Sequence, residues 1–147
     1  VAFDVPHNAV VRALTQGLLD LGILDRNTVG SVDEAIAQKA YQPYFMHRTG
    51  HWLGLDVHDC GAYSVGQQPD PNDASKTLPI FRNLEEGMTL TIEPGLYIRP
   101  SAQVPEAFWN LGIRIEDDAI VTESGCELMT RDVPVAASEI ELLMKHG

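Results

Sequence analysis

The sequence predicts an α+β fold, in which helices at both ends of the chain flank an antiparallel sheet. Two observations carry this prediction: apolar residues follow a helical period in the first 40 residues, and short strand-like runs cut by Gly and Pro follow from residue 47 onward. A length of 147 residues with 44% apolar side chains matches one domain that buries a core of its own. We therefore expect a single domain without internal repeats.

The first part of the chain predicts two helices. From about residue 5 to 21, apolar side chains recur at spacings of three and four, which is typical of an amphipathic helix. They are Val10, Val11, Leu14, Leu18 and Leu21. Ser31 followed by Glu34 fits a capping box, so a second helix is predicted from Val32 to about Ala40.

The middle of the chain predicts the sheet. Its strand-like runs are HWLGLDVHD (51–59), MTLTIEPGLYI (88–98) and LGIRIEDDAIVTE (111–123). The polar, turn-rich segment 67–79 predicts a surface loop, and residues 99–110 predict a second excursion between strands. The sheet is thus expected to be antiparallel, with two long connections beside it.

The C-terminal segment predicts a closing helix. Ser138 and Glu141 have the spacing of a capping box and precede an apolar helical pattern. We expect this helix over residues 139–146.

Charge and cysteine content exclude several classes of protein. Twenty-one acidic against ten basic residues give a formal charge of −11, which repels phosphate backbones and anionic lipid, so we expect neither nucleic acid nor membrane as a partner. No apolar run approaches the roughly 20 residues that span a bilayer. Cys60 and Cys126 form no CxxC pair, and the expectation is reduced thiols in a cytoplasmic protein.

Histidines cluster in one segment. His47, His51 and His58 lie within twelve positions, although the whole chain holds five histidines. Any one of them is compatible with an ordinary core or surface histidine, but three together indicate a site. In a continuous strand, His51 and His58 would point to opposite faces, so a bend or bulge near Gly54 is required to bring both onto one site.

Two glutamates lie in the later strand-like runs. Glu93 ends an apolar run directly before a Pro-Gly pair, and Arg114 and Glu116 share one face of the next run. Glu93 is also compatible with an exposed strand end, whereas an inward Arg and Glu would be costly unless paired or bound to metal. The aspartates at 117 and 118 are expected to lie in solvent at the strand end.

One histidine and two glutamates on separate strands suit a divalent ion that accepts oxygen and imidazole, such as Mn²⁺, Co²⁺, Fe²⁺ or Zn²⁺. The chain contains no HExxH, Walker loop, Gly-rich dinucleotide turn or GxSxG elbow. The residues by themselves therefore predict a metal hydrolase.

Three strings occur in an order that is specific to one family. FMHRTGHWLGLDVHDCGAY, EEGMTLTIEPGLYI and GIRIEDDAIVTESGCELMT resemble the C-terminal half of the catalytic domain of Xaa-Pro aminopeptidases (aminopeptidase P), within the pita-bread metallopeptidase family. The resemblance implies half of a pita-bread (creatinase/aminopeptidase-like) fold, a curved antiparallel sheet backed by helices. Residues 1–147 would then be the C-terminal part of the catalytic domain, a fragment without the family's two upstream metal-binding aspartates.

The resemblance also implies roles for the site residues. His51 and Glu93 resemble ligands of one ion, and Glu116 resembles the carboxylate that bridges two ions. Glu93 is in addition expected to relay a proton. The expected cofactors are two divalent ions, foremost Mn²⁺, with Co²⁺, Zn²⁺ or Fe²⁺ as alternatives.

Four further residues match positions close to the substrate in this family. His47 and His58 resemble non-ligand histidines that help to bind substrate and stabilise charge at the scissile carbonyl. Tyr97 and Arg114 resemble residues that support the site through contacts behind the ligands.

The implied reaction removes the N-terminal residue from a peptide whose second residue is proline. A prolidase acting on Xaa-Pro dipeptides is the first alternative, and a non-catalytic binding module on the same fold is the second. The isolated chain is expected to bind metal weakly and to have negligible activity. Its open sheet edge leads us to expect a homo-oligomer.

Overall fold

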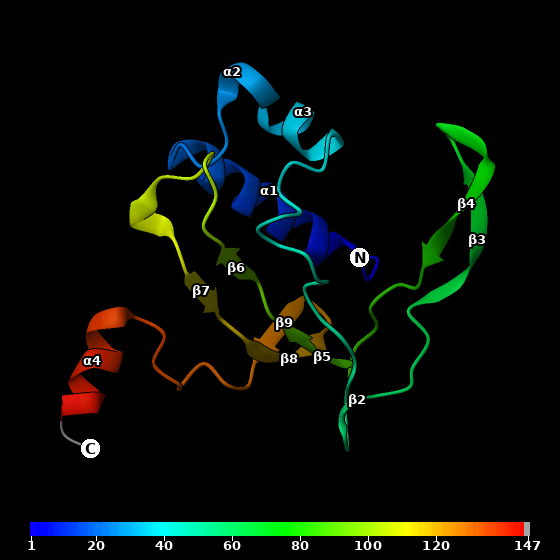
Figure 1. Cartoon of the computed structure of the whole chain (residues 1–147). Coiled ribbons are helices and arrows are strands. Elements are labelled where there is room, and N and C mark those ends of the chain that lie inside the picture. The colour runs from blue at the N-terminus through cyan, green and yellow to red at the C-terminus, as the bar shows by residue number, and fades with distance from the viewer. Residues whose placement is uncertain (146–147) are drawn as a thin grey trace.

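The computed structural model of the chain describes residues 1–145. Its helices are α1 (Val5–Asp20), α2 (Arg26–Val29), α3 (Val32–Ala37) and α4 (Ala137–Lys145), with a 3₁₀ turn at Glu106–Phe108 (Figure 1). Its strands are β1 (Leu53–Gly54), β2 (Val57–His58), β3 (Ser64–Asp70), β4 (Asp73–Phe81), β5 (Thr89–Ile92), β6 (Gly95–Ile98), β7 (Leu111–Arg114), β8 (Asp117–Thr122) and β9 (Gly125–Leu128). The mixed α+β composition predicted from the sequence is confirmed.

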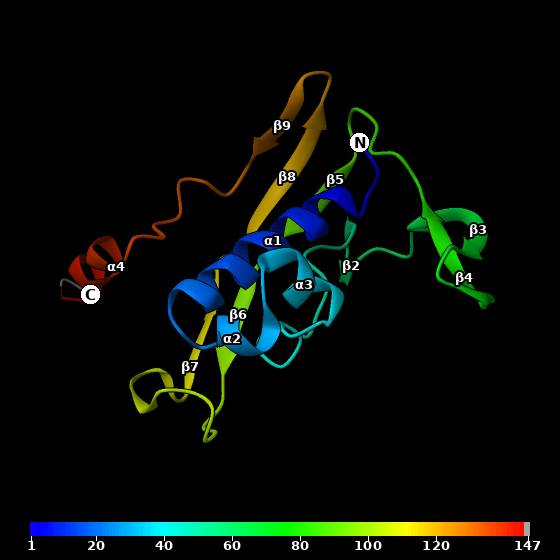
Figure 2. The ribbon, with the colours of Figure 1, turned by 90° about the horizontal axis from the view of Figure 1, so that it is seen from above.

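Helix α1 lies across one face of the sheet (Figures 1 and 2). Its bounds agree with the predicted periodicity, and its last turns bury Leu18 and Leu19 in a cluster with Ile98 and Val104. Burying side chains of this size removes about 1.5–3 kcal/mol each of unfavourable apolar exposure. The helix therefore holds the end of β6 and the following loop in place.

The capping box predicted at the start of α3 is present. The Ser31 hydroxyl accepts the Glu34 N–H, and the Glu34 carboxylate accepts the Ser31 N–H at 2.8 Å. The helix ends at Ala37, earlier than predicted, because Lys39 adopts a left-handed φ of 57° and Ala40 N–H bonds back to the Ala35 carbonyl. This is a Schellman motif. It was not predicted because Lys39 occupies the position that is usually Gly.

The sheet consists of antiparallel pairs, as predicted. Strand β8 pairs with β5 and β9, and β6 pairs with β7. The predicted runs 88–98 and 111–123 are each interrupted once, at matching points. In the first, β5 ends at Ile92 and β6 begins at Gly95; in the second, β7 ends at Arg114 and β8 begins at Asp117. Between the two breaks, the Ile115 N–H still donates to the Pro94 carbonyl at 3.1 Å. Residues in the two breaks therefore face each other.

The run 51–59 contains two short strands instead of one continuous strand. Strands β1 and β2 pair as a tight hairpin in which Leu53 lies opposite His58 and Gly54 opposite Val57. The chain thus reverses directly after Gly54, where the sequence required a bend. Val57 takes a left-handed φ of 72°, an uncommon conformation for a β-branched residue.

The segment 67–79 was predicted to be a surface loop, and this prediction is wrong. Strands β3 and β4 pair antiparallel through it and form a hairpin that projects from the rest of the chain (Figures 1 and 2). Most of its side chains are exposed on both faces. Because neither face is buried, the strands show no alternation of apolar and polar residues, and the sequence signal for strands is missing.

Helix α4 begins at Ala137, so Ser138 lies inside the helix and the predicted cap position is wrong. The predicted end at His146 lies outside the described residues. Figure 1 shows α4 apart from the sheet, and its described side chains are exposed, including the apolar residues Ile140, Leu142, Leu143 and Met144. Among residues 1–145, no helix combines the length and the apolar character needed to cross a membrane.

Candidate metal centre

Residues 49–52 run alongside β5 and form the frame of the site. The Thr91 N–H donates to the His51 carbonyl at 2.9 Å, and the Glu93 N–H donates to the Thr49 carbonyl at 2.6 Å. A Cβ on Gly50 would lie 2.1 Å from the Thr91 carbonyl oxygen, so only glycine permits this approach. The backbone therefore fixes Glu93 beside His51.

Three potential metal ligands meet at the breaks in the sheet. One ligand atom from each of His51, Glu93 and Glu116 lies within 4.8 Å of the others. Glu93 comes from the break between β5 and β6, Glu116 from the break between β7 and β8, and His51 from the segment before β1. His51 and Glu93 are buried, whereas Glu116 is exposed.

The hydrogen bonding of His51 leaves one ring nitrogen free toward the cluster. Its Nδ1 lies 2.9 Å from the Trp52 carbonyl oxygen, and because a carbonyl only accepts, Nδ1 must carry the hydrogen. The lone pair is then on Nε2, 3.6 Å from Glu93 Oε1. A tetrahedral ion with bonds of about 2.1 Å separates its ligand atoms by about 3.4 Å. These residues therefore fit a divalent ion.

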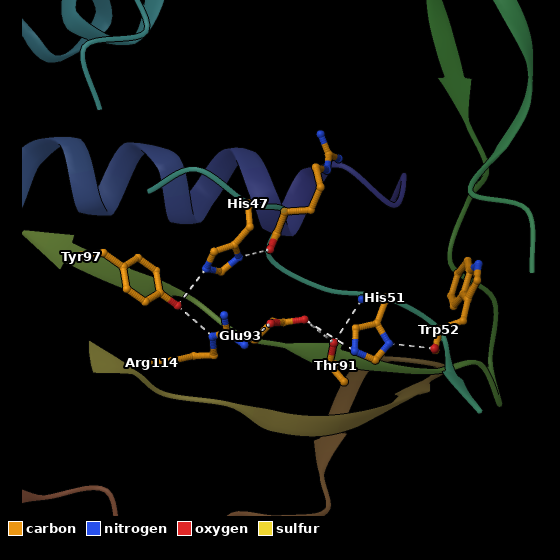
Figure 3. A network of polar contacts seen from close by, with 8 residues as sticks. His47, His51, Trp52, Thr91, Glu93, Tyr97 and Arg114 are labelled. Carbon is orange, nitrogen blue, oxygen red and sulfur yellow. Dashed lines mark hydrogen bonds and ion pairs between the residues drawn. The ribbon is translucent and has the colours of Figure 1, made fainter. Parts of the chain in front are cut away.

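Behind Glu93, a chain of polar contacts reaches His47 (Figure 3). Arg114 Nη1 lies 3.4 Å from Glu93 Oε2, and Arg114 Nε donates to the Tyr97 hydroxyl at 2.9 Å. The hydroxyl lies 3.1 Å from His47 Nε2, and His47 Nδ1 donates to the Arg48 carbonyl at 2.7 Å. With the hydrogen of a neutral ring on Nδ1, Nε2 accepts a hydrogen bond from the Tyr97 hydroxyl. The Tyr97 contact also raises the pKa of Arg114, which keeps the guanidinium charged.

The β1–β2 hairpin brings His58 to His51. Their ring centroids lie 4.2 Å apart, although the two residues would point to opposite faces of a continuous strand. His58 is exposed and lines the same cavity as His51. The structure therefore brings together all seven residues predicted for the site: His47, His51, His58, Glu93, Tyr97, Arg114 and Glu116. Their chemical roles stay predictions.

An open cavity of about 440 Å³ lies over the buried ligands. Three aromatic side chains form part of its wall, namely Phe3, Tyr63 and Phe81. The last two stand at the base of the β3–β4 hairpin, directly before β3 and at the end of β4. Sequence reasoning missed these three residues because contacts between distant segments bring them together. Pairing of β3 with β4 places Phe81 near Tyr63, and the ring of Phe3 packs on Tyr63 with centroids 4.8 Å apart.

Asp117 does not lie in solvent, so that expectation is wrong. Its side chain is buried, accepts a hydrogen bond from the Thr130 hydroxyl at 3.0 Å and pairs with Arg131 Nη2 at 2.6 Å. Thr130 and Arg131 lie after β9, and their contacts with Asp117 join that segment to the start of β8. This pair anchors the strand that follows the exposed Glu116.

A further residue of the frame, His7 on α1, was also missed. Its Nδ1 lies 3.0 Å from the Thr49 hydroxyl, and the Thr49 carbonyl in turn accepts the Glu93 N–H. Burial, and then the charge of Arg48, lower the pKa of His7 to about 4. The imidazole is therefore neutral at pH 7. The sequence contains no spacing that connects His7 with residues 42 positions further on.

A histidine and two glutamates that meet at breaks in an antiparallel sheet are suited to binding a divalent metal ion. The family model described as metallopeptidase family M24 matches residues 6–123, and the chain belongs to this family.

The relatives carry the names Xaa-Pro aminopeptidase and Xaa-Pro dipeptidase. The chain is 53% identical over 135 residues to the Xaa-Pro aminopeptidase of Escherichia coli K12, covering 92% of this chain and 27% of the relative. It is 36% identical to the Xaa-Pro dipeptidase of Rattus norvegicus, covering 94% of this chain and 30% of that protein. The resemblance found in the sequence is thereby confirmed.

The fold is also that of a solved relative. The structure of Pseudomonas aeruginosa aminopeptidase PepP superposes with a TM-score of 0.82 at 45% identity, over 99% of this chain and 29% of that one. This confirms part of a pita-bread fold. The chain spans less than a third of the length of these relatives.

Proposed function

We propose that the chain is the C-terminal part of the catalytic domain of a metal-dependent Xaa-Pro aminopeptidase, which removes the N-terminal residue from peptides with proline in second position. The cluster of His51, Glu93 and Glu116 carries this proposal, because three ligand types suited to a divalent ion meet beside a cavity. The identity of 53% to an enzyme of that name supports the substrate class.

In this proposal His51, Glu93 and Glu116 would hold the divalent ions, with Glu116 as the carboxylate that two ions would share. The ions, Mn²⁺ foremost, with Co²⁺, Zn²⁺ or Fe²⁺ as alternatives, supply a bound water of lowered pKa. Glu93 holds the proton that this water gives up. His58, exposed beside His51, donates a hydrogen bond to the carbonyl oxygen on which negative charge develops.

The other residues position these groups. Arg114 neutralises part of the Glu93 charge and fixes the Tyr97 hydroxyl, which in turn orients His47 toward the cavity. The ring of His47 packs edge-on against buried Phe45, which restricts its rotation. We assign His47 to binding of the substrate.

Three ligands do not complete a site for two ions, and we propose that two aspartates from an upstream half of the protein supply the rest. The exposure of Glu116 supports this, because a bridging carboxylate would be covered by the missing ligands. We call the polypeptide that contains both halves the complete protein. We also propose that it is cytoplasmic and forms homo-oligomers.

The first experiment compares the isolated 147-residue chain with the complete protein. The complete protein should cleave Xaa-Pro-peptides longer than dipeptides, lose this activity to a chelator and regain it with Mn²⁺. The isolated chain should bind metal weakly and show negligible cleavage. Metal-dependent cleavage by the isolated chain at the rate of the complete protein would contradict the proposal.

A second candidate is a prolidase, which is favoured by the relative named Xaa-Pro dipeptidase at 36% identity. Rates on an Xaa-Pro dipeptide and on a matched Xaa-Pro-tripeptide separate the two enzymes. A preference for the dipeptide would replace the leading proposal. A complete protein that binds metal and peptide but cleaves neither substrate would instead be a non-catalytic binding module.

A further inference from the structure

The hydroxyl of Thr91 lies between two of the candidate ligands. It accepts the backbone N–H of His51 at 3.1 Å and donates to Glu93 Oε1 at 3.2 Å (Figure 3). The side chain is 1% exposed, so water does not compete for either hydrogen bond. Thr91 thus connects the backbone that carries one ligand with the carboxylate of the other.

The direction of both hydrogen bonds follows from the chemistry of the groups. A backbone N–H only donates, so the hydroxyl oxygen accepts there, and its single hydrogen points to the Glu93 carboxylate. The Thr91 N–H also donates to the His51 carbonyl, which holds the two segments together from a second atom. A β-branched side chain has restricted χ1 freedom. The hydroxyl is therefore held in place before any ion binds.

We propose that Thr91 is a positioning residue that sets the separation of His51 Nε2 and Glu93 Oε1, and through it the affinity for the metal. These atoms lie 3.6 Å apart. The inference rests on the proposed function, because it takes His51 and Glu93 as ligands. Loss of contacts that orient ligands costs about 10- to 100-fold in metal affinity.

The close approach of Gly50 makes this geometry stiff. A Cβ on residue 50 would lie 2.1 Å from the Thr91 carbonyl oxygen, so residues 49–52 and β5 are as close as their backbones permit. A change in the Thr91 hydroxyl therefore moves the Glu93 carboxylate and leaves the backbone of residues 49–52 in place.

The experiment compares Thr91→Val, which keeps the shape and removes the hydroxyl, with Thr91→Ser, which keeps the hydroxyl. A matched control is Thr15→Val on α1, because Thr15 is also fully buried and its hydroxyl donates to the Val11 carbonyl at 2.6 Å, inside its own helix. Affinities of the metal-free complete protein for Mn²⁺ and Co²⁺ are measured by calorimetry, and the visible spectrum of bound Co²⁺ reports ligand geometry.

Thr91→Val should lower metal affinity about 10- to 100-fold and change the Co²⁺ spectrum. Thr91→Ser should stay within about threefold of the unchanged protein, and Thr15→Val should leave affinity and spectrum unchanged even if it lowers the melting temperature. Unchanged affinity in Thr91→Val, or an equal loss in Thr91→Ser, overturns the inference. If Thr91→Val does not fold, Thr91→Ala is measured against the same expectation.

Glu93→Gln separates this inference from the proposed function. If Glu93→Gln leaves metal affinity unchanged, the ligand assignment and the proposed function fail together. If Glu93→Gln abolishes binding while Thr91→Val does not weaken it, only the role of Thr91 fails.

Discussion

Glu93 and Glu116 occupy matching breaks in paired strands, yet their surroundings differ. Glu93 is 9% exposed, with its N–H bound to Thr49, one carboxylate oxygen bound to Thr91 and the other beside Arg114. Glu116 follows β7, in which every side chain is exposed. The chain therefore builds one side of the site completely and leaves the other side open.

The open side carries apolar residues that a solvated strand does not require. Leu111 is 45%, Ile113 59% and Ile115 44% exposed, all on β7 or directly after it. Contiguous exposed apolar residues mark surfaces that another segment or molecule covers. Within this chain, burial is therefore reached at Glu93, where the chain supplies its partners, and not at Glu116. This difference agrees with the proposal that an upstream half covers Glu116.

The largest expected effect is the loss of metal binding in Glu93→Gln and in Glu116→Gln. Either change should lower metal affinity of the complete protein more than about 100-fold, beyond the loss for a contact that only orients a ligand. The metal-free proteins should differ: Glu93→Gln should lose about 1 kcal/mol of unfolding free energy, because Arg114 and Thr91 lose an anionic partner. Glu116→Gln should change it by less than about 0.5 kcal/mol. Equal melting curves for both metal-free variants would contradict the difference between a partnered Glu93 and an exposed Glu116.

The next effect concerns Gly50 on the closed side. Gly50→Ala places a Cβ against the Thr91 carbonyl and should cost about 2–3 kcal/mol of unfolding free energy, since two backbone segments must separate. Gly17→Ala on α1 is the control, because nothing beyond the adjacent backbone of its own helix lies within 4 Å of the added Cβ, and alanine favours a helix interior. That control should gain up to about 1 kcal/mol. Urea unfolding of both variants measures the difference, and tolerance of Gly50→Ala would show that the frame is loose.

A smaller effect is a pH dependence that comes from His7. Its pKa of about 4 in the folded chain lies below the ordinary value of 6.5, so the unfolded chain takes up a proton first as the pH falls. The stabilisation is complete above pH 6.5 and is lost progressively toward pH 4. Because the ring is half-exposed, solvent screening reduces the effect to on the order of 1 kcal/mol.

His7→Gln tests this dependence, because glutamine does not titrate. Melting temperatures of the two proteins should run parallel above pH 7, and that of His7→Gln should fall less between pH 6.5 and 4. The carboxylates titrate in both proteins and cancel in the comparison. Melting temperatures that stay parallel down to pH 4 would contradict the placement of a neutral His7 beside Thr49.

The smallest effect in the isolated chain is expected on the open side. Ile113→Ser should change its unfolding free energy by less than about 0.5 kcal/mol, because the side chain is mostly in solvent already. In the complete protein the same change should cost more than about 1 kcal/mol if the proposed upstream half covers β7. Equal small effects in both would show that β7 stays exposed.

Local patterns predicted several features well. The period of apolar residues gave α1, the Ser31–Glu34 spacing gave the cap of α3, and the Pro-Gly pair placed Glu93 at a strand end. Each of these depends on residues at most a few positions apart. The β3–β4 hairpin was missed because its exposed strands carry no alternating pattern.

The sequence by itself determined the family, the set of candidate ligands and the helices that hold the sheet, because motifs and periodicity are written in neighbouring residues. Only the tertiary structure decided that the breaks holding Glu93 and Glu116 face each other, and that a hairpin turns His58 onto His51. It also decided the partner of Asp117. The physical reason is that strand register and buried pairing join residues distant in sequence, and such contacts are selected by the packing of the whole chain.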